Sequence, residues 1–329
     1  MAAKSLSRLR QDLELTRSDV PLIHFDYYCL RELNGQARKT DDGFFIGFSS
    51  DIYEKLANLF CALVFLPGNR IVRTLDSYRD GAVPTQSEKA LKANYSFMLA
   101  TLARDLLFDH EMAHVCNGHL DYLSRAKDSG KNVSVNVCQT LEWDADCQAS
   151  ARGLLGIAGR LSSPRKAGAD ELGFGTPKAA LFSLAFSIYV LFRSLASSGP
   201  IFEGLDKRDH PPPQLRAAWC LATIATGLQP GVNALPVTDE VKKLLDDAFP
   251  VVTEAMVCAE RGLAEARTVA VDTGPLLQTL DAESSRLLGV YRRTWAEIRD
   301  ELQALALNPR LAPAVVPYPS VPRAWTSAT

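Results

Sequence analysis

The chain has 329 residues, and its 36 Lys and Arg against 38 Asp and Glu give a formal net charge of −2. This near balance excludes a nucleic-acid-binding protein that works through a global basic field, because such proteins cluster positive charge. A hydrophobic content of 47% excludes a disordered chain and is enough for the core of one large domain or two modest ones. Only five residues are histidine, and three of them, His110, His114 and His119, fall within ten positions.

Targeting signals and cysteines indicate a cytoplasmic protein. The first twenty residues hold no apolar stretch, so no signal peptide is expected. The seven cysteines are irregularly spaced and form no CxxC pair, which predicts free thiols in a reducing compartment. Residues 179–192 are almost wholly apolar, but they are fewer than the roughly 20 that a membrane-spanning helix needs. We expect a buried central helix there and no integral membrane span.

The N-terminal part of the chain predicts a small β-sheet. Residues 20–30 and 43–48 are rich in aromatic and β-branched side chains and predict two strands, which could form a hairpin around the turn-rich residues 33–42. A helix is expected at 51–65, and residues 71–75 predict a further strand.

Helices dominate the rest of the chain. Thr85 and Glu88 fit a capping box, which marks the start of a long helix whose apolar residues recur at helical spacing as far as Met112. Asn117-Gly118 is the expected end of this helix. Beyond the polar residues 124–137, further helices are predicted at 138–162, 178–197, 214–228, 239–266 and 278–306. The fold class is therefore mainly α with a small N-terminal β-sheet.

The long helix carries an HExxH motif, His110-Glu111-Met112-Ala113-His114. Residues four apart lie about 40° apart around a helix, so both imidazoles face one point and can hold Zn²⁺. Glu111 lies beside that point without needing to bind the metal. It can take a proton from a zinc-bound water and later pass it to a leaving amine. The alternative interpretation is two structural histidines on a helix face.

A catalytic zinc site needs a third protein ligand and an open fourth position. The metzincin pattern is excluded, because it requires Gly and His where this chain has Asn117 and Leu120. His119 is close in sequence, but it lies beyond the expected helix end at Gly118. We interpret it as a polar residue at a helix end rather than a ligand.

The preferred third ligand is Glu142 on the next predicted helix. Asp146 follows at i+4, so both carboxylates share one helix face. Glu142 can then complete a His-His-Glu site, and Asp146 can accept the distal N–H of a ligand histidine, which fixes its tautomer. The alternative is a solvated acidic face, since Asp144 lies between them.

HEMAH followed by EWDAD resembles the gluzincin metallopeptidases, and among them the HtpX and CAAX-prenyl-endopeptidase group, whose motifs are HExxH and ExxxD. That group often carries His-Pro with an Arg six residues after the His, as His210-Pro211 and Arg216 do here. The resemblance implies that His210 lies near the zinc cleft, where it could stabilise the oxyanion or occupy the fourth zinc position in a resting state. It implies that Arg216 braces the acidic residues. A Pro-rich helix entry with an incidental His and Arg is the alternative.

The resemblance covers roughly residues 95–220 and departs from the group in one respect. Its members are embedded in membranes, and this chain lacks adequate spans, so a soluble relative is implied and their substrates are not transferred. The stretch HEMAHVCNGH is also similar to the phage-exclusion Lit peptidases, and the ImmA-type regulator-cleaving peptidases are a third, usually shorter, group.

Together these patterns predict an α+β zincin-like zinc metallopeptidase whose active-site helix packs antiparallel to a second ligand-bearing helix. We expect a strand-containing lobe at 1–80, the zinc core at 81–230, a further helical part of the same domain at 231–307, and a Pro-rich tail at 308–329 that is extended or mobile. Residues 43–48 could supply the edge strand that binds substrate.

The expected activity is cleavage of a protein or peptide substrate, with a regulatory partner possible and no nucleic acid bound. One alternative function is a non-catalytic module that keeps zinc for stability or binding. Another is a phage-defence or toxin-like peptidase with a single target. Glu111 argues against the non-catalytic module, because a structural zinc site has no need of a base there.

Overall fold

The structure is a computed structural model, and it describes residues 21–29, 34–67, 70–78, 87–162, 175–195, 204–225, 248–266, 282–308 and 311. These residues are mainly helical with one small sheet near the N-terminus, which confirms the predicted fold class. The strands are β1 (Leu22–Tyr28), β2 (Gly35–Thr40) and β3 (Gly43–Ser49). The helices are α2 (Ile52–Val64), α3 (Arg70–Ser77), α4 (Glu88–Cys116), α5 (His119–Asp128), α6 (Val135–Ser162), α7 (Pro177–Leu195), α8 (Pro213–Ala225), α10 (Ala248–Glu265) and α12 (Ala282–Leu305), with a 3₁₀ turn, η1, at Leu205–Lys207.

The sheet has the order β1-β3-β2. β3 pairs with β1 in parallel and with β2 in antiparallel, and a turn at Asp41-Asp42 joins β2 to β3. The predicted hairpin between 20–30 and 43–48 is therefore wrong, because the turn-rich segment between them is itself a strand. The sequence of β2, GQARKT, has no apolar alternation, so the pattern gave no strand signal there. β3 is the central strand, so it cannot supply the free edge that was expected of 43–48.

The predicted strand at 71–75 is also wrong, since these residues lie in helix α3. Ile71 and Val72 favour a strand by intrinsic preference. However, Ile71, Thr74 and Leu75 are all buried, and this i, i+3, i+4 spacing places them on one face of a helix but on both faces of a strand. Thr74 of the same helix hydrogen-bonds to Glu254 of α10 at 3.3 Å. Tertiary packing decides the conformation here.

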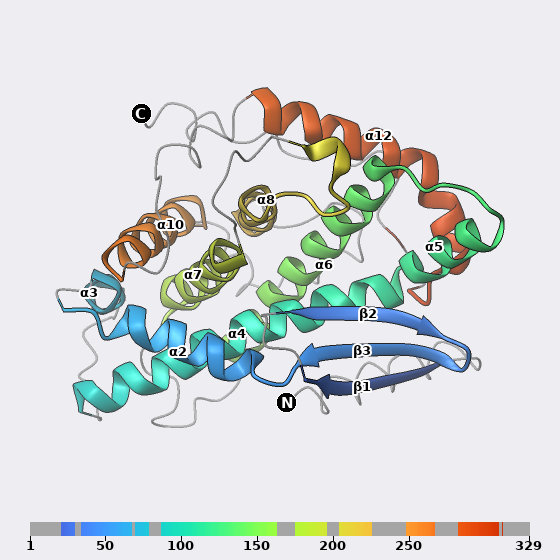
Figure 1. Ribbon diagram of the computed structural model, residues 1–329. Helices are drawn as coiled ribbons and strands as arrows, with labels where there is room; N and C mark the ends of the chain where they lie inside the picture. Colours follow the sequence, from blue (N-terminus) through green and yellow to red (C-terminus); the bar gives the residue numbers. More distant parts are fainter. Residues whose placement is uncertain are drawn as a thin grey trace.

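The long helix α4 organises the molecule (Figure 1). Ser87 is its N-cap and accepts a hydrogen bond from the amide of Ala90 at 3.4 Å, so the helix begins later than the predicted capping box. Thr85 lies outside the described residues. The helix ends as predicted at Asn117, and Gly118 has a φ of +78°, the left-handed region that favours glycine.

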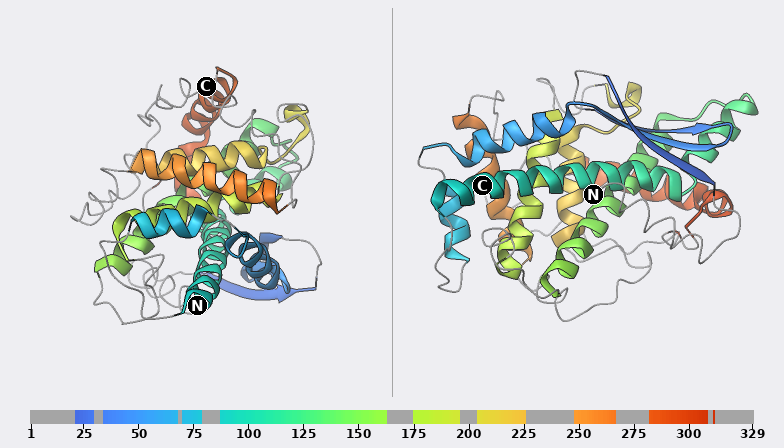
Figure 2. Two further views of the ribbon diagram at one scale, coloured as in Figure 1. Left: turned by 90° about the vertical axis from the view of Figure 1, so that its left-hand side faces the viewer. Right: turned by 90° about the horizontal axis from the view of Figure 1, so that it is seen from below.

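Other elements pack on different parts of α4. The sheet flanks its C-terminal half and α2 its N-terminal half, while α6 and α7 lie on its other side (Figure 2). Helix α6 runs back in the opposite sense at an oblique angle (Figure 1). The last turns of α4 are therefore enclosed between the sheet and α6, and these turns hold the HExxH motif.

Helix α7 is the central helix that was expected at 178–197. Its apolar side chains are buried against α4, α8 and α10. Ser183 and Ser187 are accommodated because their hydroxyls donate to the carbonyls of Ala179 and Ser183 at 2.7 and 2.8 Å. By length and composition α7 could cross a membrane, and 83% of its apolar window is buried inside the protein. The absence of a membrane span stays a prediction.

Helices α8 and α12, from the C-terminal half of the chain, both pack on α6. Helix α12 packs on α5 and α6, and it closes a second hydrophobic cluster around Trp143, Trp219 and Trp295. The short helix α5 was not predicted, because its residues read as part of a polar stretch. Of the tail at 308–329, only Asn308 and Leu311 are described, and Leu311 is buried.

Candidate metal centre

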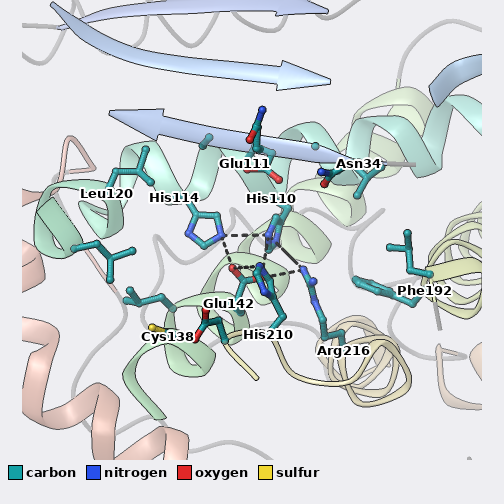
Figure 3. A pocket seen from close by; sticks show the side chains of 18 residues that line it. Asn34, His110, Glu111, His114, Leu120, Cys138, Glu142, Phe192, His210 and Arg216 are labelled. Atoms are coloured by element: carbon teal, nitrogen blue, oxygen red, sulfur yellow. Dashed lines mark hydrogen bonds and ion pairs between the residues drawn. The ribbon is translucent and has the colours of Figure 1, made fainter. Parts of the chain in front are cut away.

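The HExxH motif and the predicted third ligand meet in the structure. His110 and His114 occupy successive turns of α4, and Glu142 approaches them from α6 (Figure 3). The Nε2 atoms of the two histidines are 3.2 Å apart, and Glu142 Oε1 lies 3.3 Å from His114 Nε2. Glu142 Oε2 lies 3.4 Å from His110 Nε2. One ligand atom of each residue falls within 4.8 Å of the others.

This arrangement fits a zinc ion. The three side chains are buried, and two imidazole nitrogens with one carboxylate oxygen form a donor set that zinc takes in catalytic sites. Glu142 Oε2 is buried, and it pairs with His110 Nε2 at 3.4 Å and Arg216 Nη2 at 3.3 Å without a hydrogen bond of ordinary geometry among the described residues. A bound cation would give this carboxylate oxygen a direct contact.

Asp146 contacts the far side of His110, and Arg216 pairs with Asp146. The sequence predicted Asp146 behind a ligand histidine, and the resemblance implied that Arg216 braces the acidic residues. His110 Nδ1 lies 2.9 Å from Asp146 Oδ1. Arg216 donates two hydrogen bonds to Asp146, at 2.7 and 2.8 Å, and its Nη2 lies 3.3 Å from Glu142 Oε2. The guanidinium also stacks 5.1 Å from the ring centre of Phe192. Bidentate pairing of this kind fixes both position and orientation of the carboxylate.

The charges of these groups are strongly coupled. Burial lowers the pKa of His110, but its hydrogen bonds to Asp146 and Glu142 outweigh burial and raise the pKa to about 10. Burial raises the pKa of the Glu142 carboxyl, but His114 and Arg216 outweigh it and bring the pKa well below its ordinary value. The pKa of Asp146 is likewise lowered, because Arg216 outweighs burial. Both carboxylates are therefore ionised at neutral pH.

His210 lies at the mouth of the site. It precedes α8, whose fourth residue is Arg216, and its Nε2 is 3.4 Å from Glu142 Oε1. Its side chain is 66% exposed, in contrast to the buried ligands. The segment from 210 to 216 thus brings one exposed and one buried basic side chain to the same carboxylate, as the resemblance implied.

Sequence reasoning missed the partners of His114. His119 was interpreted as a bystander, but it is fully buried and its Nδ1 lies 3.0 Å from His114 Nδ1. Asp144, to which the sequence assigned no role in the site, is also buried, and its Oδ2 lies 3.3 Å from His119 Nε2. Residues two apart point to different sides of a helix, so Asp144 contacts His119 and Asn117, which lie around the turn between α4 and α5. In the sequence, the third histidine of HEMAHVCNGH, His119, was the one signal that could have indicated a partner for His114.

The ligands line a cleft of about 380 Å³. One wall is the start of the edge strand β2, from Gly35 to Ala37, and Glu111 points from α4 toward the sheet (Figure 3). A Cβ atom on Gly35 would meet the Phe48 ring at 2.3 Å and Glu111 Oε1 at 3.3 Å, so only glycine allows β2 to come this close. Apolar residues also line the cleft: Leu107, Leu120, Leu123, Leu141, Phe192 and Leu195. Of these, Leu120 and Phe192 lie on opposite sides of the candidate ligands (Figure 3).

Comparisons with known proteins find no matching family model, no matching curated protein and no matching solved structure. The resemblance to the gluzincin peptidases stays a prediction, carried by the three sequence motifs. What the chain does is therefore argued from its side chains and their chemistry.

Proposed function

We propose that this protein is a zinc-dependent endopeptidase, in which His110, His114 and Glu142 bind the metal. The observation that supports this most strongly is the meeting of two α4 imidazoles and one α6 carboxylate within 4.8 Å, with Glu111 beside them in an open cleft. Three protein ligands and an accessible cleft are typical of a catalytic zinc site, whereas structural sites have four ligands.

Glu111 acts as general base and then as general acid. When bound, the zinc ion lowers the pKa of a water molecule and polarises the scissile carbonyl. The Glu111 carboxylate takes the proton of the attacking water and delivers it to the nitrogen of the leaving amine. Its position next to His110 in α4 keeps it at the ligands while it faces the cleft.

His210 and Arg216 support the reaction in different ways. The imidazole of His210 is exposed at the cleft mouth and can donate a hydrogen bond from Nε2 to the carbonyl oxygen as negative charge develops there. Arg216 is buried and stays bound to Asp146 and Glu142, so it holds the carboxylates in place and does not contact substrate.

The substrate of this proposed enzyme is an extended peptide segment with apolar side chains near the cleaved bond. β2 is an edge strand that borders the cleft, so a peptide can pair with it as an added strand. This replaces the expectation that residues 43–48 provide the edge. Apolar residues lie on both sides of the ligands, which favours Leu-like or aromatic side chains on either side of the cleaved bond.

The proposal is tested by comparing Glu111→Gln with Glu142→Ala. We expect Glu111→Gln to keep zinc, measured by metal analysis of the purified protein, and to lose cleavage of cellular proteins, measured by proteomics of new N-termini. Glu142→Ala should lose both, because it removes a ligand. If Glu111→Gln keeps the full biological activity of the protein, the peptidase proposal fails and a non-catalytic zinc module takes its place.

A further inference from the structure

We propose that His119 is a positioning residue that fixes the tautomer and the ring orientation of the zinc ligand His114. This inference rests on the proposed zinc site, and it concerns how the chain builds that site. It assigns a role to a buried histidine that binds neither metal nor substrate. Three observations support it: the hydrogen-bond inventory around His114, the contrast with His110, and the way the turn before His119 is held.

The hydrogen-bond inventory allows a single consistent arrangement of protons. His114 turns Nε2 toward His110 and Glu142, so this nitrogen must be unprotonated to bind metal. Its Nδ1 then carries the hydrogen and donates to His119 Nδ1 at 3.0 Å. His119 then carries its hydrogen on Nε2, which lies 3.3 Å from Asp144 Oδ2 in a polar contact whose geometry falls short of a hydrogen bond. The same Asp144 oxygen accepts a hydrogen bond from Asn117 Nδ2 at 2.6 Å.

The two ligand histidines are supported by different means. His110 contacts a carboxylate directly, through Asp146 at 2.9 Å. The Nδ1 atom of His114 contacts no carboxylate directly. It contacts the imidazole of His119, which lies between His114 and Asp144. A partner on the second ring nitrogen holds a metal-binding imidazole in one tautomer and one orientation. His119 therefore supplies to His114 what Asp146 supplies to His110.

The position of His119 is set by the turn between α4 and α5. Gly118 adopts its left-handed conformation, and a Cβ there would lie within 3.0 Å of the backbone of α12. The amide of Asn308, just after α12, donates to the carbonyl of Cys116 at 2.9 Å. His119 is the first residue of α5 and is fully buried. A side chain held this firmly can orient its neighbour.

The test is the zinc affinity of four proteins, measured by competition with a chromophoric chelator. They are the wild type, His119→Leu, His119→Asn and His119→Gln. Asn places a polar atom where His119 has Nδ1, so it can still accept from His114. Gln places its amide where His119 has Nε2, so it reaches Asp144 but not His114. Asn and Gln are matched in chemistry and differ in which neighbour they reach.

We expect His119→Leu and His119→Gln to bind zinc about ten- to a hundred-fold more weakly than the wild type, which is the usual loss when a ligand's supporting partner is removed. His119→Asn should recover most of the affinity. The absorption bands of the cobalt-substituted proteins should follow the same order, because they report the ligand geometry. Far-ultraviolet circular dichroism of the metal-free proteins checks folding, and His24→Leu, at an exposed histidine of β1, is the control.

The inference is overturned if folded His119→Leu binds zinc as tightly as the wild type, or if Asn and Gln bind equally well. Should the Leu variant not fold, the Asn and Gln pair decides the question alone. Failure of the proposed function looks different. Wild-type protein that binds no zinc removes the metal site itself, and wild-type protein that binds zinc without cleaving peptides removes only the peptidase activity.

Discussion

Glu142, Asp144 and Asp146 occupy every second position along one stretch of α6, and all three carboxyl groups are buried. Each has a different neighbour: Glu142 faces both ligand histidines, Asp144 faces His119, and Asp146 pairs with Arg216. So much negative charge in a buried place needs positive charge nearby. In the metal-free protein, part of that charge is the proton that His110 keeps, because Asp146 and Glu142 raise its pKa to about 10.

Zinc binding is expected to release this proton. The pKa of His110 is about 10 without metal, so the ring is protonated at pH 7 and must lose its proton before Nε2 can bind. Zinc affinity should therefore rise about tenfold per pH unit from neutral pH up to about pH 10 and level off above it. Calorimetric titrations in two buffers of different ionisation enthalpy measure the proton directly. Equal heats in both buffers at pH 7 would contradict this.

At the scale of elements, the approach of β2 to α4 shapes the proposed substrate cleft. Gly35 lies against the Phe48 ring and close to Glu111, and this contact leaves no room for a side chain. The strand edge and the proposed base are thus held at a fixed separation. A peptide added to β2 would be presented to Glu111 at that separation.

Gly35→Ala is expected to lower kcat/KM for peptide cleavage by about ten- to a hundred-fold while zinc affinity stays unchanged. The added Cβ would meet the Phe48 ring at 2.3 Å, so strand and ring must move apart, and a shift of about 1 Å at a reacting group has effects of this size. Thr40→Ala, at an exposed position of the same strand outside the cleft lining, is the control. An unchanged kcat/KM in Gly35→Ala would show that β2 does not position the substrate.

The sequence predicted the elements whose signal is local and missed those that depend on distant partners. The helices that carry HExxH and ExxxD show apolar periodicity and a Gly end signal, and the structure has both. β2 is a strand because it pairs with β3, and its own residues do not indicate one. Asp144 is buried beside Asn117 and His119, which lie more than twenty residues earlier, around the turn between α4 and α5. No local pattern contains that information.

At the scale of the whole molecule, α12 closes the side of the site that faces away from the cleft. Its buried residues, with Trp143 of α6 and Trp219 of α8, form the second hydrophobic cluster. Leu302 is fully buried in this cluster, and its carbonyl lies 3.0 Å from the place where a side chain on Gly118 would begin. The stability of this half of the protein and the geometry of the α4–α5 turn therefore depend on the same contacts.

Leu302→Ala is expected to lower the free energy of unfolding by about 2–5 kcal/mol, because it removes buried methyl groups and leaves a cavity. Leu22→Ala, at a position that is about half exposed, should change it much less. Thermal and urea unfolding of the metal-free proteins measure both. Equal losses for the two variants would mean that α12 contributes little to the fold.

The bonds between the end of α4 and the segment after α12 join residues 191 positions apart. On the ribosome, all three proposed metal ligands have been made once Asp146 is in place, yet Asn308 follows only 162 residues later. At about 5–20 residues per second this is an interval of roughly ten to thirty seconds. Throughout that time the growing chain carries the ligands without the cover that seats His119. The order of synthesis alone therefore delays completion of the proposed metal site until α12, the last helix that the structure describes, has been made.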